Sequence, residues 1–309
     1  MTPIKTQKPP KSLLEAIRYF SDEDRAFEFF KQLRWPDGEV ACPRCGEMDP
    51  YFLSTRHIWK CRGCRKQFSL KVGTIFEDSP IALDKWLPAV WLIANSKNSI
   101  SSHELARALQ VTQKTAWFML HRIRFAMESE TFEKLFGTSE IDETYVGGRG
   151  EFVHRRVLKL RGYPPKTPVQ GVRNRDTGTV RAKVITGEGQ LKANVHSWIE
   201  PGATVYTDEA QAYRTIGDTY IHDFVTHQGP TRNRYVRGDV HTNGIENFWA
   251  LLKRAIKGTQ VHVDRKHLDR YVTERVFAYN YRGETDLERM QRVLAGASGR
   301  RLTFDELAG

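Results

Sequence analysis

Long apolar runs are absent from this sequence of 309 residues. No stretch of about 18 consecutive apolar residues occurs, and a helix needs roughly that length to cross a bilayer. The first twenty residues also lack the apolar core of a secretory signal peptide. These two absences predict a soluble intracellular protein, and we expect it in the cytoplasm.

Cysteine is also scarce. All four cysteines fall between positions 42 and 64, and none follows. A large secreted fold held together by disulfides needs cysteines spread along its length. The distribution therefore excludes a disulfide scaffold and indicates a local role for these thiols.

Acidic residues are outnumbered, because 37 Asp and Glu stand against 48 Lys and Arg, which gives a net charge of +11 and a pI near 9.5. A basic surface attracts polyanions, and nucleic acid is the usual one. A basic soluble protein without such a partner has the same composition. The length predicts two or three compact units, and a hydrophobic fraction of 39% can supply their cores.

The cysteines form two CxxC pairs, Cys42-x2-Cys45 and Cys61-x2-Cys64, with fifteen residues between them. Each pair directs two thiolates at one point, and a β-hairpin of the intervening length brings both pairs around a tetrahedral Zn²⁺. A redox dithiol pair or two disulfides are the alternatives. Because four thiolates leave no open coordination position, we expect a structural zinc, in a zinc ribbon at residues 39–80.

Helical periodicity flanks the cysteine segment on both sides. Residues 1–38 are typical of a polar tail followed by helices, and the period returns over 81–130. A short helix, a turn and a longer helix in the second stretch have the spacing of a helix-turn-helix. An ordinary helical hairpin in a connector fits that spacing equally well. In the first interpretation, the longer helix displays to DNA the side chains of Gln113, Lys114, Arg122 and Arg124.

Strand patterns begin at Thr138 and then alternate with helical ones, which predicts a mixed α/β domain over 138–285. We expect residues 286–309 to form a C-terminal tail. A basic loop follows the first strand, and it is either solvated or in contact with a phosphate backbone. The net charge favours the contact with DNA. Its cations are Arg149, Arg155, Arg156, Lys159, Arg161 and Lys166.

Three acids occupy unusual positions in this domain. Asp142 stands mid-strand in "EIDETYV", where a charge is costly unless it has a partner. Asp208 ends the apolar strand "ATVYTD", at the sheet edge where α/β proteins place ligands. Glu246 borders the apolar stripe of the amphipathic helix in "HTNGIENFWALLKRAIKG".

Each acid also has an ordinary interpretation. Asp208 suits a helix N-cap, Asp142 an edge-strand charge, and Glu246 a capping box in which Asn243 is the N-cap and Gly258 the C-cap. Acids that converge repel one another unless a divalent cation lies between them. Oxygen ligands of this kind suit Mg²⁺ or Mn²⁺.

The three acids, followed by Lys253, resemble the DDE/K pattern of transposases and integrases. More narrowly, "IDETYVGG", "VYTDEAQAY" and "HTNGIENFWALLKR", preceded by a four-cysteine zinc ribbon, resemble the ISXO-type insertion-sequence transposases of bacteria. The resemblance covers about residues 20–285. It implies a ribonuclease-H-like α/β fold, a mixed sheet with flanking helices, after a zinc ribbon and a helical segment.

The resemblance also implies a mechanism. Two Mg²⁺ or Mn²⁺ ions held by Asp142, Asp208 and Glu246 activate water to cut DNA and then activate the freed 3′-OH to attack target DNA. Asn can fill the family's third position, so Asn243 is the alternative ligand or only the helix cap. We favour Glu246, because an anion holds Mg²⁺ better than an amide. Lys253 then contacts a phosphate, unless it is merely solvated, and Arg254 is a further candidate for DNA contact.

The expected partners are the terminal inverted repeats of the element and the target DNA, both double-stranded, and no membrane. The zinc ribbon and the helices over 99–128 are expected to read the repeats, while the basic loop holds the backbone. Joining two ends suggests a homodimer. The alternatives are a DNA-binding regulator with an inactive ribonuclease-H-like domain, and a nuclease that cuts without joining.

Overall fold

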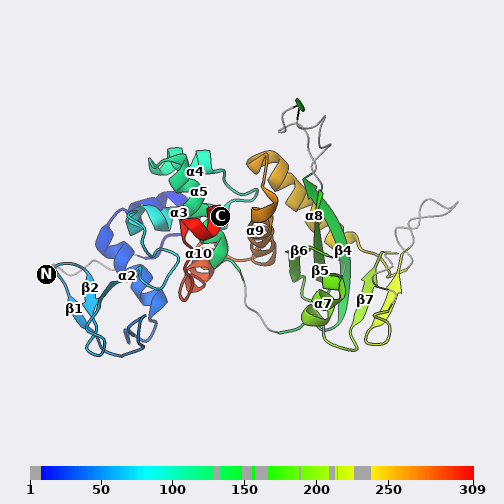
Figure 1. The fold of residues 1–309 in the computed structure, drawn as a ribbon, viewed down its shortest axis with the longest axis horizontal. Coiled ribbons are helices and arrows are strands. Elements are labelled where there is room, and N and C mark those ends of the chain that lie inside the picture. The colour runs from blue at the N-terminus through cyan, green and yellow to red at the C-terminus, as the bar shows by residue number, and fades with distance from the viewer. Residues whose placement is uncertain are drawn as a thin grey trace. The chain divides into compact units, whose positions relative to one another are not determined.

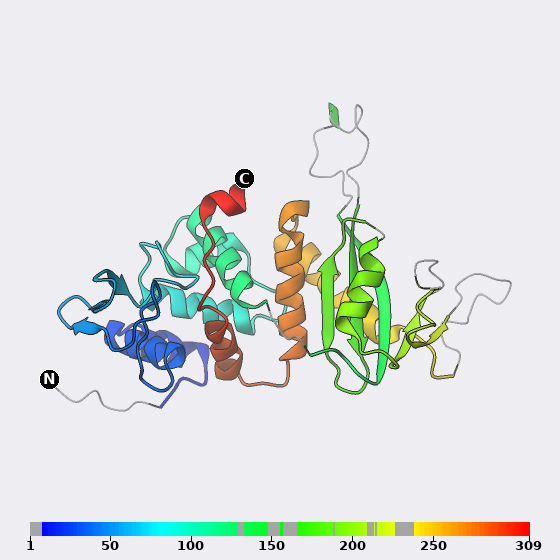
Figure 2. The same ribbon diagram turned by 60° about the horizontal axis from the view of Figure 1, so that its bottom comes forward.

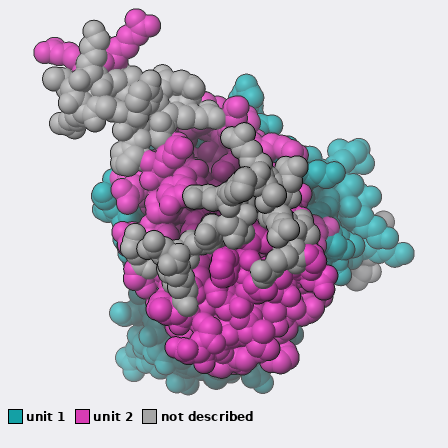
Figure 3. Space-filling view, turned by 90° about the vertical axis from the view of Figure 1, so that its right-hand side faces the viewer, with its two compact units in different colours: residues 1–129, 283–309 teal, residues 130–282 magenta. Residues whose placement is uncertain are grey.

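The computed structural model describes residues 8–128, 133–147, 155–156, 166–187, 189–208, 213, 215–225 and 238–309. The chain divides into two compact units, which Figure 3 colours separately. Unit 1 comprises Met1–Ser129 and Gly283–Gly309, and unit 2 comprises Glu130–Arg282. In the described part of the chain, every helix is too short or too polar to span a membrane.

Unit 1 begins with two helices, α1 (Leu13–Phe20) and α2 (Glu23–Arg34), as the periodicity predicts. Both start at side-chain caps, because Ser12 and Asp22 accept hydrogen bonds from backbone N–H groups of the first turn. Their buried faces are aromatic, and Phe20 and Phe30 are fully buried.

The zinc-ribbon segment forms an antiparallel sheet of β1 (Tyr51–Leu53), β2 (Ile58–Lys60) and β3 (Gln67–Ser69) in that order. The hairpin expected between the CxxC pairs is β1 and β2. Trp59 on β2 is only 3% exposed and stacks between Phe68 and Phe27 of α2, with ring centroids 5.7 and 5.6 Å apart. The ribbon is therefore packed on α2 through aromatic contacts.

Three further helices follow the ribbon, namely α3 (Leu83–Asn95), α4 (Ser102–Leu109) and α5 (Gln113–Ala126). Between α4 and α5, Gln110 takes the left-handed conformation and Thr112 caps α5. The helix, turn and second helix expected here are present.

Residues 286–309 differ from the expected tail. They form α10 (Asp286–Ala295) and α11 (Phe304–Ala308), and the side chains of Met290, Val293 and Leu294 are buried. Backbone hydrogen bonds from Ile75 to Ala297 and from Gly299 to Gly73 join the segment to the chain after the ribbon. Its apolar positions complete the core of unit 1, which is why it is ordered.

Unit 2 is built on a five-stranded sheet in the order β6-β5-β4-β7-β8 (Figures 1 and 2). β4 pairs antiparallel with β5 and parallel with β7, so the sheet is mixed. This architecture confirms the expected α/β class. The strands are β4 (Thr138–Gly147), β5 (Lys166–Asn174), β6 (Val180–Val184), β7 (Thr204–Thr207) and β8 (Ile221–Phe224).

Helices cover both faces of this sheet. On one face, α7 (Gly189–Trp198) packs on Ile141 and Val172, and on the other α8 (Asn243–Ala255) and α9 (Leu268–Asn280) pack on Val169 and Val180. Gly171 on β5 allows α8 to lie close, because an added Cβ would come within 2.5 Å of the Trp249 ring. The helix expected after Asp208 falls outside the described residues.

The ends of α8 differ from the expected capping. Asn243 is the first helical residue, and Thr242 takes the N-cap position without a side-chain cap. Gly258 lies inside a π-helical turn, Ile256–Gln260, which continues the chain beyond α8. At the N-terminal end, a carboxylate from β4 accepts the N–H of Ile245 and takes the place of a local side-chain cap.

Candidate functional site

The four cysteines converge on one point. Their sulfur atoms all lie within 4.8 Å of one another, with 3.8 Å between Cys42 and Cys64 and 3.5 Å between Cys45 and Cys61. A Zn–S distance of about 2.3 Å places the sulfurs of a tetrahedral site roughly 3.8 Å apart. The four thiols therefore fit a structural Zn²⁺.

Local backbone geometry builds this site twice in the same way. Gly46 follows the first pair with φ of 76°, and Arg65 follows the second with φ of 57°. The backbone N–H of Cys42 donates to Glu47, and that of Cys61 donates to Lys66. A backbone hydrogen bond from Glu47 lowers the pKa of Cys45 to about 7, whereas burial raises the pKa of Cys61 to about 11, so the fit to zinc rests on the geometry of the four sulfurs.

Asp142 projects from β4 toward α8. Its Oδ2 accepts a hydrogen bond of 3.0 Å from the indole Nε1 of Trp249. Burial raises the pKa of Asp142 to about 6, and the negative charges of Asp208 and Glu246 contribute to the rise, although the backbone N–H of Glu143 and the indole oppose it. Burial is the main cause of this rise in the pKa of Asp142, and the two neighbouring carboxylates add to it.

Asp208 directly follows β7, which pairs in parallel with β4. The last pairs in register are Ser139 with Val205 and Glu140 with Tyr206. Continued by two residues beyond the last pair, this register places Asp208 opposite Asp142, and neighbouring strands lie about 4.8 Å apart. The parallel pairing of β4 with β7 therefore directs the two aspartates, which were predicted on separate strands, toward the same part of the sheet.

Glu246 and Asn243 lie in the first turn of α8, and both are exposed. Glu246 accepts a 3.0 Å hydrogen bond from the hydroxyl of Thr242. Lys253 and Arg254 are exposed further along the same helix. Among the described residues, only the four cysteines bring three or more metal-ligand atoms within 4.8 Å of one another. The carboxylate oxygens of Asp142, Asp208 and Glu246 are therefore farther apart than the cysteine sulfurs.

The chemistry of the acidic set fits a hard divalent cation. Asp142, Asp208 and Glu246 offer carboxylate oxygens, and the charges of the last two act on Asp142; such sets suit Mg²⁺ or Mn²⁺. Trp249 engages one oxygen of Asp142, and the second oxygen is the one that can hold a cation.

Two family models and one relative match this chain. Residues 134–280 match the model of the ISXO2-like transposase domain, and residues 21–67 match that of the transposase zinc-ribbon domain. A protein of Halobacterium salinarum, described as an uncharacterized protein in transposable element ISH50, is 30% identical over 256 residues. That alignment covers 77% of this chain and 84% of the relative. The chain belongs to the ISXO2-like transposase family.

Sequence reasoning missed a fourth acid beside the site of this transposase. Burial raises the pKa of Glu143 to about 8, and the charges of Asp208 and Asp142 contribute to the rise. Its Oε1 is buried without a hydrogen-bond partner in the described part of the chain. The sequence did place Glu143 next to Asp142, in "IDE". Adjacent side chains on a strand point to opposite faces, so this neighbour was not expected to act on the same site.

Glu140 was missed as well. Its side chain is completely buried, and its Oε2 accepts a 2.9 Å hydrogen bond from the backbone N–H of Ile245 in the first turn of α8. This carboxylate satisfies an N–H group in the first turn of α8 that the expected capping box of Asn243 and Glu246 would leave unpaired. No signal within the helix sequence indicates a cap that comes from a strand about a hundred residues earlier, at |i−j| of 105.

The structure corrects two of the expected DNA contacts of the transposase. Arg122 is 4% exposed and donates to the backbone oxygens of Leu302 and Glu77, and Arg124 is 1% exposed. Both face the core because α10, α11 and the segment before α3 pack on this side of α5. Neither arginine is displayed to DNA.

Other expected contacts keep an exposed position. Lys114 is exposed at the start of α5, where its ammonium lies 4.4 Å from the centre of the Phe304 ring, and Gln113 is exposed beside it. Arg155 and Arg156 are exposed. Three cations of the basic loop lie outside the described residues: Arg149, Lys159 and Arg161.

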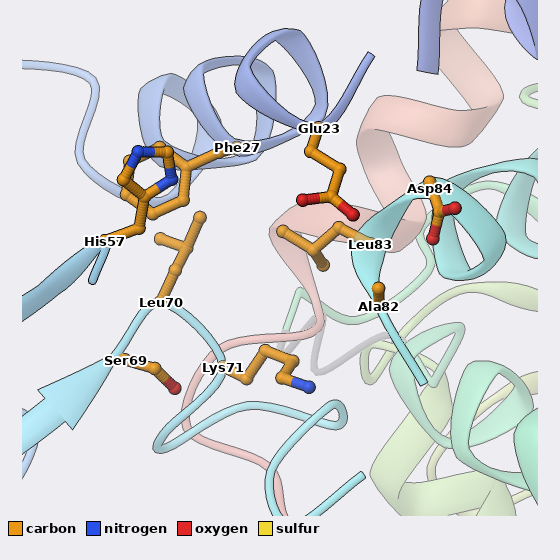
Figure 4. Close-up of a pocket in the computed structure, with 9 residues that line it drawn as sticks. All are labelled: Glu23, Phe27, His57, Ser69, Leu70, Lys71, Ala82, Leu83 and Asp84. Atoms are coloured by element: carbon orange, nitrogen blue, oxygen red, sulfur yellow. The ribbon is translucent and has the colours of Figure 1, made fainter. Parts of the chain in front are cut away.

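A separate pocket of about 200 Å³ lies in unit 1, between α2, the end of the ribbon and the start of α3 (Figure 4). Phe27, Leu70 and Leu83 give it an apolar wall, and Glu23, Lys71 and Asp84 lie at its margin. None of the three acids of the transposase pattern lines it. The pocket is therefore not the candidate catalytic centre.

Proposed function

We propose that this transposase cuts DNA at the ends of its insertion sequence and joins the freed 3′-OH to target DNA. The observation that supports the proposal is the parallel pairing of β4 with β7, whose register, continued by two residues, brings Asp208 opposite Asp142, while the charge of Glu246 also acts on Asp142. A regulator needs no such convergence, and both family matches name a transposase.

Asp142, Asp208 and Glu246 are the proposed ligands of two Mg²⁺ or Mn²⁺ ions. When bound, such ions activate the attacking oxygen and stabilise the leaving one in an in-line displacement at phosphorus. The residues of the chain hold and orient these groups. Trp249 fixes the carboxylate of Asp142 from one side, and Thr242 fixes that of Glu246.

Lys253 is the proposed phosphate contact next to the scissile bond. It lies seven residues after Glu246 on α8, which is about two helical turns and the same face. Its exposed ammonium can meet a phosphate as a point charge. Arg254 follows as a second contact with the backbone.

Unit 1 is the proposed reader of the terminal inverted repeats. Its zinc ribbon and the pair α4 and α5 supply the elements, and the exposed start of α5 offers Gln113 and Lys114. The basic loop of unit 2 holds the backbone of the double-stranded DNA without reading sequence. Because two ends are joined, we propose a homodimer that acts at the nucleoid in the cytoplasm.

Replacing either strand aspartate tests the proposal. We expect Asp142→Asn and Asp208→Asn each to reduce Mg²⁺-dependent cleavage of a duplex carrying the element end by at least about a thousandfold, a loss of roughly 4 kcal/mol of transition-state stabilisation. Binding of the same duplex, measured by gel shift, is expected to remain within about twofold, because Asp-to-Asn removes charge without removing a DNA contact. Wild-type cleavage by either variant would refute the assignment.

The third ligand needs its own comparison. Glu246→Gln is expected to abolish cleavage, and Asn243→Ala to reduce it by less than about tenfold, since the anion contributes more than the amide to holding a dication. If only Asn243→Ala is inactive, Asn243 is the ligand. A strand-transfer assay with precut ends then separates joining from cutting alone, because a simple nuclease yields no joined product.

A further inference from the structure

A buried ion-pair network lies at the base of α8. Glu140 is on β4, two residues before Asp142 and therefore on the same face of the sheet, and its side chain is fully buried. A buried carboxylate is costly unless charge and hydrogen bonds compensate it. The hydrogen-bond partners of Glu140 therefore indicate its role in the fold.

Both oxygens of Glu140 are engaged, and each holds a different segment. Oε1 accepts a 2.7 Å hydrogen bond from Nε of Arg175, and Oε2 accepts the N–H of Ile245. Arg175 also donates to the backbone oxygens of Asp239 at 2.6 Å and His241 at 2.8 Å. One carboxylate therefore ties the first turn of α8 to β4 and, through Arg175, fixes the chain that leads into this helix.

The register of α8 on β4 follows from this contact and one other. Glu140 binds the N–H of Ile245, and Asp142, two strand residues on, accepts from the indole of Trp249, four helix residues on. Two strand residues span about 6.6 Å, and four helix residues span about 6 Å. The two contacts match in spacing, and Glu246 lies between them on the helix.

Gly244 makes this approach sterically possible. A Cβ at that position would lie 2.7 Å from Oε2 of Glu140 and 2.5 Å from Nη1 of Arg173. Glu140 cannot withdraw, because its two oxygens are held by Arg175 and Ile245. A side chain at this position would push α8 away from β4.

We propose that Glu140 is a positioning residue of the active site, which sets α8 on β4 at the register and depth where Glu246 meets Asp142 and Asp208. The inference rests on the proposed metal-dependent cleavage. Glu140 itself binds neither cation nor DNA in this account, since both of its oxygens are committed within the protein. Its loss is expected to change how much metal the site requires.

Two variants and one control test the proposal. Glu140→Gln removes the charge that pairs with Arg175, and Gly244→Ala keeps every hydrogen-bonding group of the network but adds a methyl group that does not fit between α8 and Glu140. Asn280→Ala is the control, because it removes two hydrogen bonds to Val180 at the far edge of the sheet and touches none of the network. Thermal unfolding of all three shows how much stability each loses.

The first readout is the Mn²⁺ concentration that gives half-maximal cleavage of a duplex carrying the element end. We expect Glu140→Gln and Gly244→Ala to raise it by about tenfold or more, the effect typical of residues that orient metal ligands. Asn280→Ala is expected to keep the wild-type value. An equal shift in Asn280→Ala, or a wild-type value in both network variants, would overturn the proposal.

The second readout needs no metal. Amide hydrogen exchange at Ile245 is expected to be faster in Glu140→Gln by about tenfold, while the amides of β4 keep their protection. Wild-type exchange at Ile245 in a folded variant would overturn the positioning role. If Glu140→Gln does not fold, Gly244→Ala carries both readouts, because alanine is intrinsically favourable within a helix.

The proposed cleavage activity and the positioning role of Glu140 can be refuted separately. If Asp142→Asn cleaves like the wild type, the proposed function is wrong, whatever the network does. If Asp142→Asn is inactive but the metal requirement does not depend on Glu140 or Gly244, the function stands and the positioning role is wrong.

Discussion

The zinc site and the proposed acidic site of this transposase are built on opposite principles. The zinc site takes all its ligands from Cys42 to Cys64 and closes each half with a local turn. The acidic site takes Asp142 from β4, Asp208 from the end of β7 and Glu246 from α8, which are joined only by sheet pairing and helix packing. The first is a short-range motif that folds around its metal, and the second is a product of the whole domain.

The difference has an energetic side. The ribbon has an aromatic core around Trp59 that is packed beside the thiols. In the acidic cluster, burial and neighbouring negative charges raise the pKa of Asp142 to about 6 and that of Glu143 to about 8. The zinc site is therefore expected to add stability, whereas the buried acids lower it.

Removing a zinc ligand is expected to give the largest loss of stability. Cys61→Ser should lower the free energy of unfolding of unit 1 by several kcal/mol, because apparent binding energies of structural zinc reach roughly 10 kcal/mol. Thermal unfolding and a gel shift with the element end are the measurements, and both stability and end binding should fall. Asp49→Asn, an exposed substitution on the same ribbon, is the control. A Cys61→Ser protein as stable as the control would remove the contrast between the two centres.

Glu143→Gln is expected to raise stability, whereas Cys61→Ser lowers it. With a folded pKa of about 8 against an ordinary value of 4.5, Glu143 contributes stability that is present below about pH 4.5 and is lost as the pH rises through about 8. Glutamine cannot ionise, so at pH 8.5 the variant should be more stable than the wild type by at least about 1.4 kcal/mol, the equivalent of one pKa unit.

Urea unfolding at pH 5 and pH 8.5 measures this effect. The difference between variant and wild type should be larger at the higher pH. Glu200→Gln, on an exposed position of the same unit, should show no such pH dependence. Equal stability of Glu143→Gln and wild type at pH 8.5 would show that this acid is not held at a cost.

Trp249→Phe is expected to give the smallest of these effects on activity. It removes the hydrogen bond that lowers the pKa of Asp142, so that pKa should rise further above about 6. The acidic limb of the pH–rate profile for cleavage should move to higher pH by a few tenths of a unit, and stability should fall by about 1–3 kcal/mol. Trp198→Phe, on the opposite face of the sheet, is the matched control and should leave the profile in place.

Local patterns predicted most of the elements. The helix, turn and longer helix over 102–126 and the ribbon hairpin follow periodicity and turn residues that act within a few positions. The errors lie where a remote segment competes with a local signal. Arg122 and Arg124 have the charge of DNA contacts, but the C-terminal helices, expected as a tail, bury that side of α5.

For the candidate site, the sequence identified the acids, because charge is unusual on apolar strands. The pairing of β4 with β7 was needed to see that Asp142 and Asp208 lie on neighbouring strands or at their ends. Asn243 was expected to cap α8, yet Glu140 of β4 satisfies an N–H of its first turn. A carboxylate from elsewhere in the domain can replace a local cap, and no pattern within one helix reveals it.

The sequence by itself determined the zinc ribbon, the order of helices and strands, and the identity of the acids, because each depends on spacing over a few residues. Only the tertiary structure decided which acids act on one another, which arginines are buried, and how α8 is fixed against β4. Those outcomes depend on strand pairing and on buried charges whose partners are distant in the sequence, 105 positions away for Glu140 and Ile245 and 180 for Arg122 and Leu302.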